Sequence, residues 1–202
     1  MEERKEEMER LAEDRDRESR QLYEENGYVL DYLPFGKPGV RPKYRAGAVV
    51  QIIGESYFTL LEANVRQGAV LKPLDHVYVG KEARHEITYI LGRVGYEELT
   101  ENAKIELESA VEKIVQNREK SFINFFNSAQ PITPRMHALE LIPGIGKKYM
   151  WDILDGRDKK LFSSFEELQN RINIPNPARL LAKRIIEELS GDSKYRLFTR
   201  TS

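Results

Sequence analysis

The sequence contains no cysteine, only three histidines and no long apolar run, and each absence excludes a class of protein. Without cysteine the chain has no disulfide, thiolate zinc site, Fe–S cluster or cysteine nucleophile. His76, His85 and His137 are scattered, which argues against a histidine-ligated metal centre. No apolar run approaches the roughly 18 residues of a membrane span, and the N-terminus is too charged for a secretory signal. We therefore expect a cytoplasmic protein with no metal site and no membrane association.

Charge is unevenly distributed along the chain, although the net charge is only −1. Segments 1–26 and 96–130 contain an excess of acidic residues, whereas 27–95 and 131–202 contain an excess of basic ones. Hydrophobic residues make up 40% of the 202 positions, which is enough for two small cores. Two basic modules, preceded and separated by acidic helical segments, are compatible with nucleic-acid binding.

Composition and periodicity divide the chain into five segments, and together they predict an α+β fold. Residues 1–21 contain almost no apolar side chains, which favours a solvated helix or a tail without a core. The predicted segments are a charged N-terminal helix or tail (1–26), a small β-barrel (27–95), a connecting helix (96–130), an all-α domain (131–191) and a C-terminal tail (192–202).

Between Gly27 and Gly95 the sequence consists of short β-like runs separated by glycine and proline. About five strands with few helix signals predict a small closed barrel rather than an open sheet. The predicted strands are Tyr28–Leu33, Ala48–Ile53, Tyr57–Asn64, Asp75–Val79 and His85–Val94.

The rest of the chain is predicted to be helical, with a capping side chain at the start of most helices. A long connecting helix follows Thr100, and its apolar residues recur at helical spacing on one face. Four shorter helices follow Pro131. Their expected starts are Thr133-Pro134, Lys147, Ser164 and Asn176-Pro177, and the expected stops include Leu141, Gly156 and Gly191.

The sharpest functional signal is the segment LELIPGIGKK, in which two predicted helices meet at a tight turn. Gly144 and Gly146 lack a Cβ, so the turn can adopt unusual dihedral angles and its backbone can approach a ligand. Amides at the start of the second helix point outward in the positive field of the helix N-terminus. A phosphate oxygen is the natural acceptor, and Lys147 and Lys148 add positive charge. Ile145 is expected to anchor the turn in the core.

This segment resembles the helix–hairpin–helix motif of proteins that bind DNA and RNA without sequence specificity. The resemblance implies that hairpin amides contact a sugar–phosphate backbone, in some members with a monovalent cation on hairpin carbonyls; we expect no other cofactor. A second copy lacks both glycines and contains prolines, which donate no amide, so we expect a structural role for it. In this alignment Ile142, Gly144 and Gly146 correspond to Ile172, Ile174 and Asn176.

Four segments extend the resemblance along the chain: YVLDYLP (28–34), ESYFTLLE (55–62), DHVYVGK (75–81) and ELIPGIGKK (140–148). Together they resemble an uncharacterised, largely archaeal family, domain of unknown function 655. This resemblance implies an OB-like (oligonucleotide-binding) barrel over 27–95 and a tandem helix–hairpin–helix domain over 131–191. It implies no activity, because none is established for the family.

The predicted barrel offers a second candidate site, in the loop between its first two strands. Basic residues alternate there with aromatic ones, and no acidic residue lies among them. Basic side chains neutralise phosphates while aromatic faces stack on bases, as in OB folds that bind single strands. A solvated loop whose aromatic residues pack back onto the barrel is an equal alternative. The candidate residues are Phe35, Lys37, Arg41, Lys43, Tyr44 and Arg45.

We therefore expect a non-enzymatic protein that binds the backbone of RNA or DNA, with RNA weakly favoured because OB folds suit single strands. The alternative is a protein-interaction scaffold in a ribosome, translation or DNA-maintenance complex, with a partner on the acidic helix or N-terminal tail. A base-excision glycosylase/lyase with Lys148 as Schiff-base nucleophile is a remote third, because Glu166 stands where an aspartate is expected. Trp151 is interpreted as core packing, and His137 as a surface or capping residue of the first hairpin helix.

Overall fold

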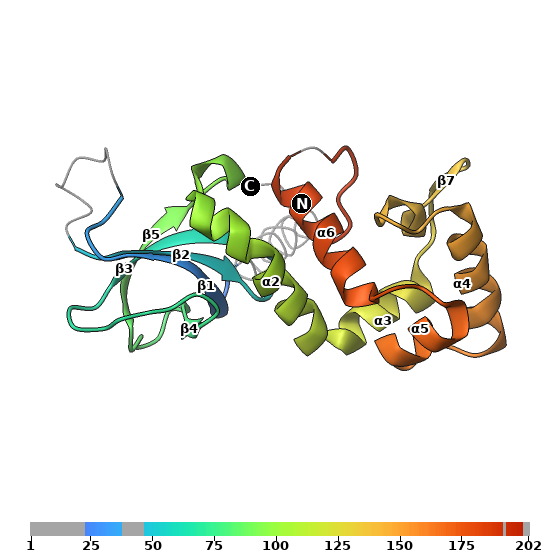
Figure 1. The fold of residues 1–202 in the computed structure, drawn as a ribbon, viewed down its shortest axis with the longest axis horizontal. Helices are drawn as coiled ribbons and strands as arrows, with labels where there is room; N and C mark the ends of the chain where they lie inside the picture. Colours follow the sequence, from blue (N-terminus) through green and yellow to red (C-terminus); the bar gives the residue numbers. More distant parts are fainter. Residues whose placement is uncertain (1–22, 38–46, 192, 200–202) are drawn as a thin grey trace, which may run out of the picture.

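The computed structural model describes residues 23–37, 47–191 and 193–199, which form an elongated α+β structure (Figure 1). A curled sheet lies at one end, the short helices of the last third lie at the other, and a long helix runs between them. The predicted N-terminal helix or tail over 1–21 lies outside the described residues.

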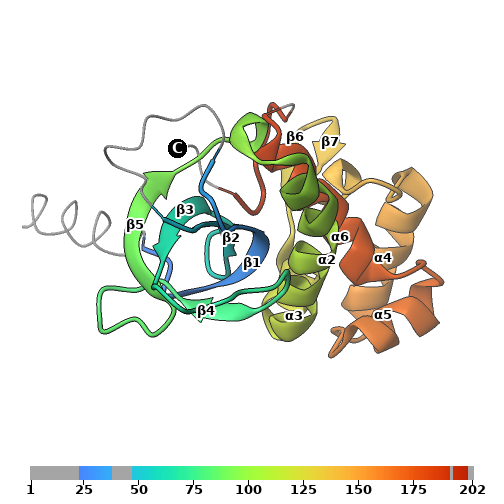
Figure 2. The ribbon, with the colours of Figure 1, turned by 60° about the vertical axis from the view of Figure 1, so that its left-hand side comes forward.

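Five antiparallel strands form the sheet, in the order β4-β1-β2-β3-β5. Their bounds are β1 Asn26–Leu33, β2 Val49–Gly54, β3 Leu60–Val65, β4 His76–Tyr78 and β5 Ile87–Arg93, and each matches a predicted strand. Figure 2 shows the curl of the sheet. Side chains alternate between the two faces of a strand, and one set forms an interior core. That core includes Val29, Val50, Ile52, Ala63 and Ile87.

The described strands form a half-barrel rather than the closed barrel that the strand count suggests. The order of the sheet begins at β4 and ends at β5, so these two strands are its edges within the described residues. β4 has only three residues, which leaves it little length for a second ladder. The number and position of strands follow from local pattern, whereas closure depends on strand length and curvature.

The connecting segment consists of three pieces, η2 Tyr96–Glu98, α2 Glu101–Asn117 and α3 Glu119–Ser128. Thr100 caps α2 as predicted, because its side chain accepts a hydrogen bond from the amide of Ala103. The helix breaks at Arg118, whose guanidinium donates to the carbonyls of Glu55 and Ser56 in the β2–β3 turn. The predicted apolar face of α2 is buried, at Ala103, Leu107, Ala110, Val111, Ile114 and Val115.

A row of polar side chains on the outer face of the sheet receives the start of α2. Asp31, Gln51 and Glu62 are neighbours on β1, β2 and β3. The Thr100 hydroxyl donates to the Asp31 carboxylate at 2.6 Å, and the Thr100 amide donates to the Gln51 side chain at 2.9 Å. Gln51 also donates to Glu62 at 2.9 Å. The row thus fixes the end of α2 against the sheet.

The prediction that the last third begins with a helix from Thr133 to about Leu141 is wrong. The chain instead forms a small hairpin, β6 Pro131–Thr133 and β7 Met136–His137, followed by the 3-10 helix η3 Ala138–Leu141. Thr133-Pro134 opens the turn of this hairpin, since a proline suits a turn as well as a first helical position. The cap is His137, whose Nδ1 accepts from the amide of Leu139.

The other three helices are α4 Lys147–Lys159, α5 Phe165–Ile172 and α6 Pro177–Leu189. The predicted caps at their starts are confirmed for α5 and α6. Ser164 accepts from the amide of Glu167, and Asn176 accepts from the amide of Arg179. Beyond the end of α6, Gly191 has a φ of +89°, the left-handed conformation expected after a helix.

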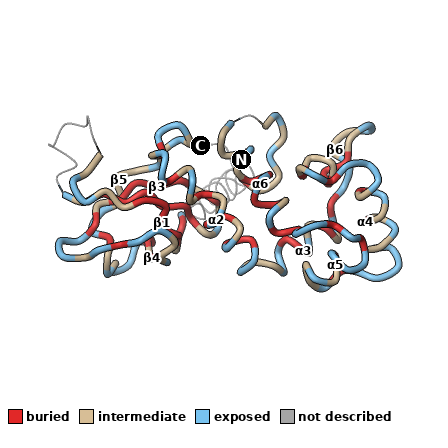
Figure 3. The backbone as a smooth tube through the Cα atoms, in the orientation of Figure 1, coloured by how far each residue is buried: buried red, intermediate tan, exposed pale blue. Residues whose placement is uncertain are grey.

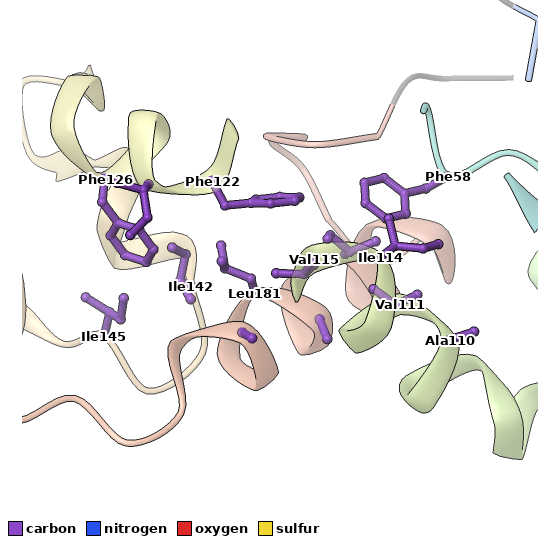
Figure 4. Packing of buried hydrophobic residues seen from close by; sticks show 14 of the residues in the cluster. Phe58, Ala110, Val111, Ile114, Val115, Phe122, Phe126, Ile142, Ile145 and Leu181 are labelled. Carbon is purple, nitrogen blue, oxygen red and sulfur yellow. The ribbon is translucent and has the colours of Figure 1, made fainter. Parts of the chain in front are cut away.

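One hydrophobic cluster connects the outer face of the sheet to the C-terminal helices. Figure 4 shows Phe58 and Ile114 towards one end, Phe122 and Leu181 in the middle and Ile145 at the other end. The burial map follows the same path, with buried backbone along the inner strands and α2 and exposed backbone on the outer turns (Figure 3). The sheet and the helices therefore share a core through α2.

The segment after α6, predicted to be a tail, is held against the body of the protein at residues 193–199. The Glu188 carboxylate of α6 has no exposed surface and accepts from the amides of Leu197, Phe198 and Thr199 at 2.7–3.0 Å. The ring of Phe198 packs on Phe125, with 4.9 Å between centroids. A buried carboxylate thus fixes the course of this segment.

Candidate nucleic-acid interface

The hairpin between η3 and α4 is anchored by two buried isoleucines. Ile142 is 1% exposed and Ile145 is 2% exposed. Figure 4 shows Ile142 between Phe126 of α3 and Leu181 of α6, and Ile145 on the side of Phe126 away from Leu181. The anchoring role expected for Ile145 is therefore what the structure shows. Because both ends of the turn are fixed in the core, the backbone between them is presented to solvent in one conformation.

The two hairpin positions are occupied by glycine for different structural reasons. Gly144 has a φ of +89°, which disfavours any residue with a Cβ, and a Cβ there would lie 3.2 Å from Leu180. Gly146 has ordinary extended dihedral angles, and a Cβ built on it would meet none of the described residues within 4 Å. Only Gly144 is needed for the turn. At Gly146 the missing side chain leaves open space outside the start of α4.

The start of α4 has free amide donors and no negative charge of its own. Gly146 is the N-cap residue and supplies no side-chain acceptor, and no acidic residue lies in the first turn. The first bond to the cap is donated by the amide of Met150 to the carbonyl of Gly146. Within the described residues, the amides of Lys147 and Lys148 have no hydrogen-bond acceptor, and both side chains are exposed. Such a helix start favours an anion.

Trp151 lies on the surface beside these lysines, and the prediction that it packs in the core is wrong. Its side chain is 59% exposed, whereas Met150 and Ile153 are 6% and 0% exposed. The buried stripe of α4 contains Met150 and Ile153. Trp151 follows Met150 by one residue, which is a rotation of about 100° around the helix axis and turns it away from this stripe. Trp151 follows Lys147 by four residues and Lys148 by three, so all three lie on one face. The signal in the sequence that could have placed Trp151 at the site is its spacing of three and four residues from the two lysines.

The second hairpin, Asn173–Asn176, is related to the first. Gly146 and Asn176 are both N-caps, as the alignment by sequence pairs them, but the turn residues before them differ from that alignment by one position. Asn173 has a φ of +59° and corresponds to Gly144, and Ile174 is fully buried as Ile145 is. Asparagine tolerates the left-handed conformation better than other residues with a side chain. The sequence alignment paired Gly144 with Ile174 because it matched spacing rather than conformation.

Carboxylates of α2 occupy the surroundings of this second hairpin. Glu112 accepts from the side-chain amide of Asn176 at 3.2 Å, and Glu108 pairs with Arg179 at 3.0 Å. These acidic side chains would repel a phosphate at the start of α6. Arg184 is not available to a phosphate either, since it is buried and paired with Glu188 at 3.0 Å. The second hairpin therefore docks α6 on α2, in agreement with the structural role expected from its sequence.

The candidate loop of the sheet is described only at its first residues. Phe35 is 98% exposed, so at this position the aromatic side chain does not pack back onto the sheet. Lys37 is turned inward, pairing with Glu62 at 2.9 Å and donating to the carbonyl of Glu98 at 2.7 Å. The other candidates, Arg41, Lys43, Tyr44 and Arg45, lie outside the described residues. The structure places neither Phe35 nor Lys37 on the hairpin.

His137 is a titratable side chain that caps η3, the element leading into the hairpin before α4. Its Nδ1 accepts from the Leu139 amide at 3.1 Å, and its own amide donates to Glu140 at 2.8 Å. Burial lowers the pKa of His137 below its ordinary 6.5, with a further contribution from the positive charge of Arg157, against the opposing effect of Glu140. Folding thus favours neutral His137, so its contribution to stability is complete above about pH 6.5 and is lost as the pH falls.

We expect the hairpin to loosen on acidification, because a protonated imidazole cannot accept from the Leu139 amide. Hydrogen exchange at the Leu139 amide should become faster, relative to the intrinsic rate, as the pH falls from about 7 to about 5. A His137→Asn variant, which can still cap η3, should remove this dependence. Equal protection of Leu139 at both pH values in the native protein would contradict the role of His137 as a cap.

Lys148, the candidate Schiff-base nucleophile, is exposed and forms no ion pair within the described part of the chain. Glu166 lies in the first turn of α5, a different helix.

No helix of the described residues is both long and apolar enough to cross a membrane.

Comparison with known proteins places the chain among uncharacterised archaeal proteins. The family model described as "Protein of unknown function (DUF655)" matches residues 23–200. The uncharacterized protein MJ0038 of Methanocaldococcus jannaschii is 42% identical over 182 residues, which cover 89% of this chain and 82% of that protein. The crystal structure of Af1531 from Archaeoglobus fulgidus, of the same family, is 44% identical with a TM-score of 0.81. It covers 88% of this chain and all of Af1531.

Proposed function

The chain belongs to the DUF655 family of proteins of unknown function, and we propose that it is a non-enzymatic protein that binds the sugar–phosphate backbone of nucleic acid through the hairpin before α4. The observation that carries this proposal is the start of α4. Its amides lack acceptors among the described residues, its first turn lacks acidic side chains, and Lys147 and Lys148 are exposed next to it. All three properties favour a phosphate at the same place.

The relation between the two hairpins supports a helix–hairpin–helix identity for the last third. Each has a residue with positive φ followed by a buried isoleucine, and each leads into a helix of 13 residues. Two such units that pack on one another are typical of a tandem domain. The 3-10 form of η3 departs from the usual first helix, but the position of the turn relative to α4 is the feature that binding requires.

An exposed tryptophan favours RNA or unpaired DNA over a duplex as the ligand. Trp151 lies one helical turn from the two lysines, so a nucleotide whose phosphate contacts the start of α4 has an aromatic surface within reach. Stacking on an aromatic side chain requires an unstacked base, which single strands and RNA loops provide. An OB-like identity of the half-barrel, a fold suited to single strands, would point in the same direction.

Binding to three short nucleic acids tests the proposal. We expect the full chain to bind single-stranded RNA, duplex RNA and duplex DNA at about 50 mM salt, with affinities that fall as salt rises, because released counterions drive backbone binding. Fluorescence anisotropy with labelled 20-mers of random sequence provides the measurement. A protein that binds none of the three at this salt would favour the alternative function, a scaffold for other proteins.

A Trp151→Ala variant distinguishes single-strand from duplex recognition. We expect its affinity for single-stranded RNA to fall by about tenfold, because stacking is worth about 1–3 kcal/mol per base, while duplex binding changes little. Leu161, which is 61% exposed on the loop after α4, gives the control Leu161→Ala. Equal losses on both nucleic acids would remove the argument for unpaired bases.

A further inference from the structure

A cleft of about 740 Å³ lies where the sheet meets the segment after α6, and we propose that it binds a nucleoside phosphate. One wall consists of the β2–β3 turn with the start of β3, and of the chain from the end of β5 into η2. The other consists of the end of α6 and residues 193–199. None of its lining residues belongs to the hairpin before α4, so this proposal does not rest on the function proposed above.

Basic side chains reach the cleft from both of its walls. Arg93 approaches from the end of β5, and Lys194 and Arg196 approach from the segment after α6. Among the described residues that line the cleft, none is acidic, although the chain has 33 acidic and 32 basic residues. Cations brought together from two distant parts of the sequence attract an anion, and guanidinium groups bind phosphate oxygens with charge-assisted hydrogen bonds.

Tyrosine and hydroxyl side chains indicate that the anion carries more than a phosphate. Tyr57 and Tyr96 line the cleft on the side of the sheet, where they can contact a flat ring. Thr59 and Ser193 add hydroxyl groups that can donate to or accept from a sugar or a base. The volume lies within the range of roughly 300–1,000 Å³ that is usual for sites of small organic ligands. Phosphate, sugar and base together make a nucleoside phosphate.

The wall after α6 is rigid because of contacts that lie behind it. The Glu188 carboxylate accepts from three successive amides, from Leu197 to Thr199, and also from the Thr199 hydroxyl. Arg184 donates to the carbonyl of Tyr195 on the same segment. The backbone that carries Lys194 and Arg196 is therefore fixed before any ligand arrives, which lowers the entropic cost of binding.

Titration calorimetry of the full chain with ADP tests the site. We expect ADP to bind at about 50 mM salt and a Lys194→Gln/Arg196→Gln variant to bind it at least about tenfold more weakly, because hydrogen bonds to charged groups are worth about 1.5–3 kcal/mol. A Lys120→Gln/Lys159→Gln variant, which removes two exposed lysines elsewhere, should bind as the native protein does. Thermal unfolding of each variant shows whether the fold is retained.

Further ligands decide which part of the nucleotide is recognised and from which source it comes. ADP should bind more tightly than inorganic pyrophosphate, and a Tyr57→Leu variant should reduce this difference. Stronger binding of a trinucleotide with a 5′-phosphate than of ADP would identify the end of a strand as the source, and the reverse would identify a free nucleotide. The proposal is overturned if pyrophosphate binds as tightly as ADP, if neither ADP nor the phosphorylated trinucleotide binds, or if a folded Lys194→Gln/Arg196→Gln variant binds ADP as the native protein does.

Discussion

Replacing Lys147 and Lys148 together by glutamate should weaken the binding of any nucleic acid by on the order of a hundredfold at low salt, without regard to sequence. Both side chains are exposed beside the free amides at the start of α4. A hydrogen bond to a charged group contributes about 1.5 kcal/mol or more, and two of them amount to about two orders of magnitude in affinity. The introduced carboxylates would in addition oppose the phosphate at the helix N-terminus.

The salt dependence of binding identifies the lost contacts as phosphate contacts. Each lysine on a duplex phosphate contributes about 0.9 to the slope of log affinity against log salt, so the double variant should have a slope smaller by about two. The matched control is Lys120→Glu/Lys159→Glu, which changes the net charge equally at two other exposed lysines of α3 and α4. If both double variants lose the same affinity, overall charge rather than the hairpin determines binding.

Replacing Glu188 by alanine should lower the free energy of unfolding by about 3–5 kcal/mol, the cost of breaking a buried ion pair from one side. Glu188 has no exposed surface, and its carboxylate holds Arg184 as well as three backbone amides. Removing it leaves a buried guanidinium and several buried donors without acceptors. The loss should appear in urea denaturation of the full chain followed by circular dichroism.

The neighbouring glutamate provides the control for this experiment. Glu187 lies on the same helix and pairs with the same arginine at 3.5 Å, but its side chain is 48% exposed. Glu187→Ala should therefore change the free energy of unfolding by no more than about 1 kcal/mol, as is usual for exposed ion pairs. If Glu188→Ala is no more destabilising than Glu187→Ala, the buried carboxylate does not hold residues 193–199 in place.

Features that depend on neighbours along the chain are predictable from the sequence. The five strands, the caps at Thr100, Ser164 and Asn176 and the buried face of α2 follow from alternation, helical spacing and capping chemistry, which act over a few residues. The hairpin before α4 was predictable for the same reason, because its glycine, its isoleucine anchor and its lysines all lie within one turn.

The tertiary structure alone decided which side chains the rest of the protein covers or brings together. Trp151 could have faced the core or the solvent, and the rotation of α4 around Met150 and Ile153 left it outside. Lys37 was as plausible a phosphate ligand as Lys148 until the fold placed Glu62 at 2.9 Å from it. The cleft unites Arg93 with Arg196, about one hundred residues later in the chain, and only the path of residues 193–199 along α6 and the sheet makes them neighbours. Long-range contacts, and the exact rotation of a short helix such as α4, are properties of the packed chain that a local pattern does not determine.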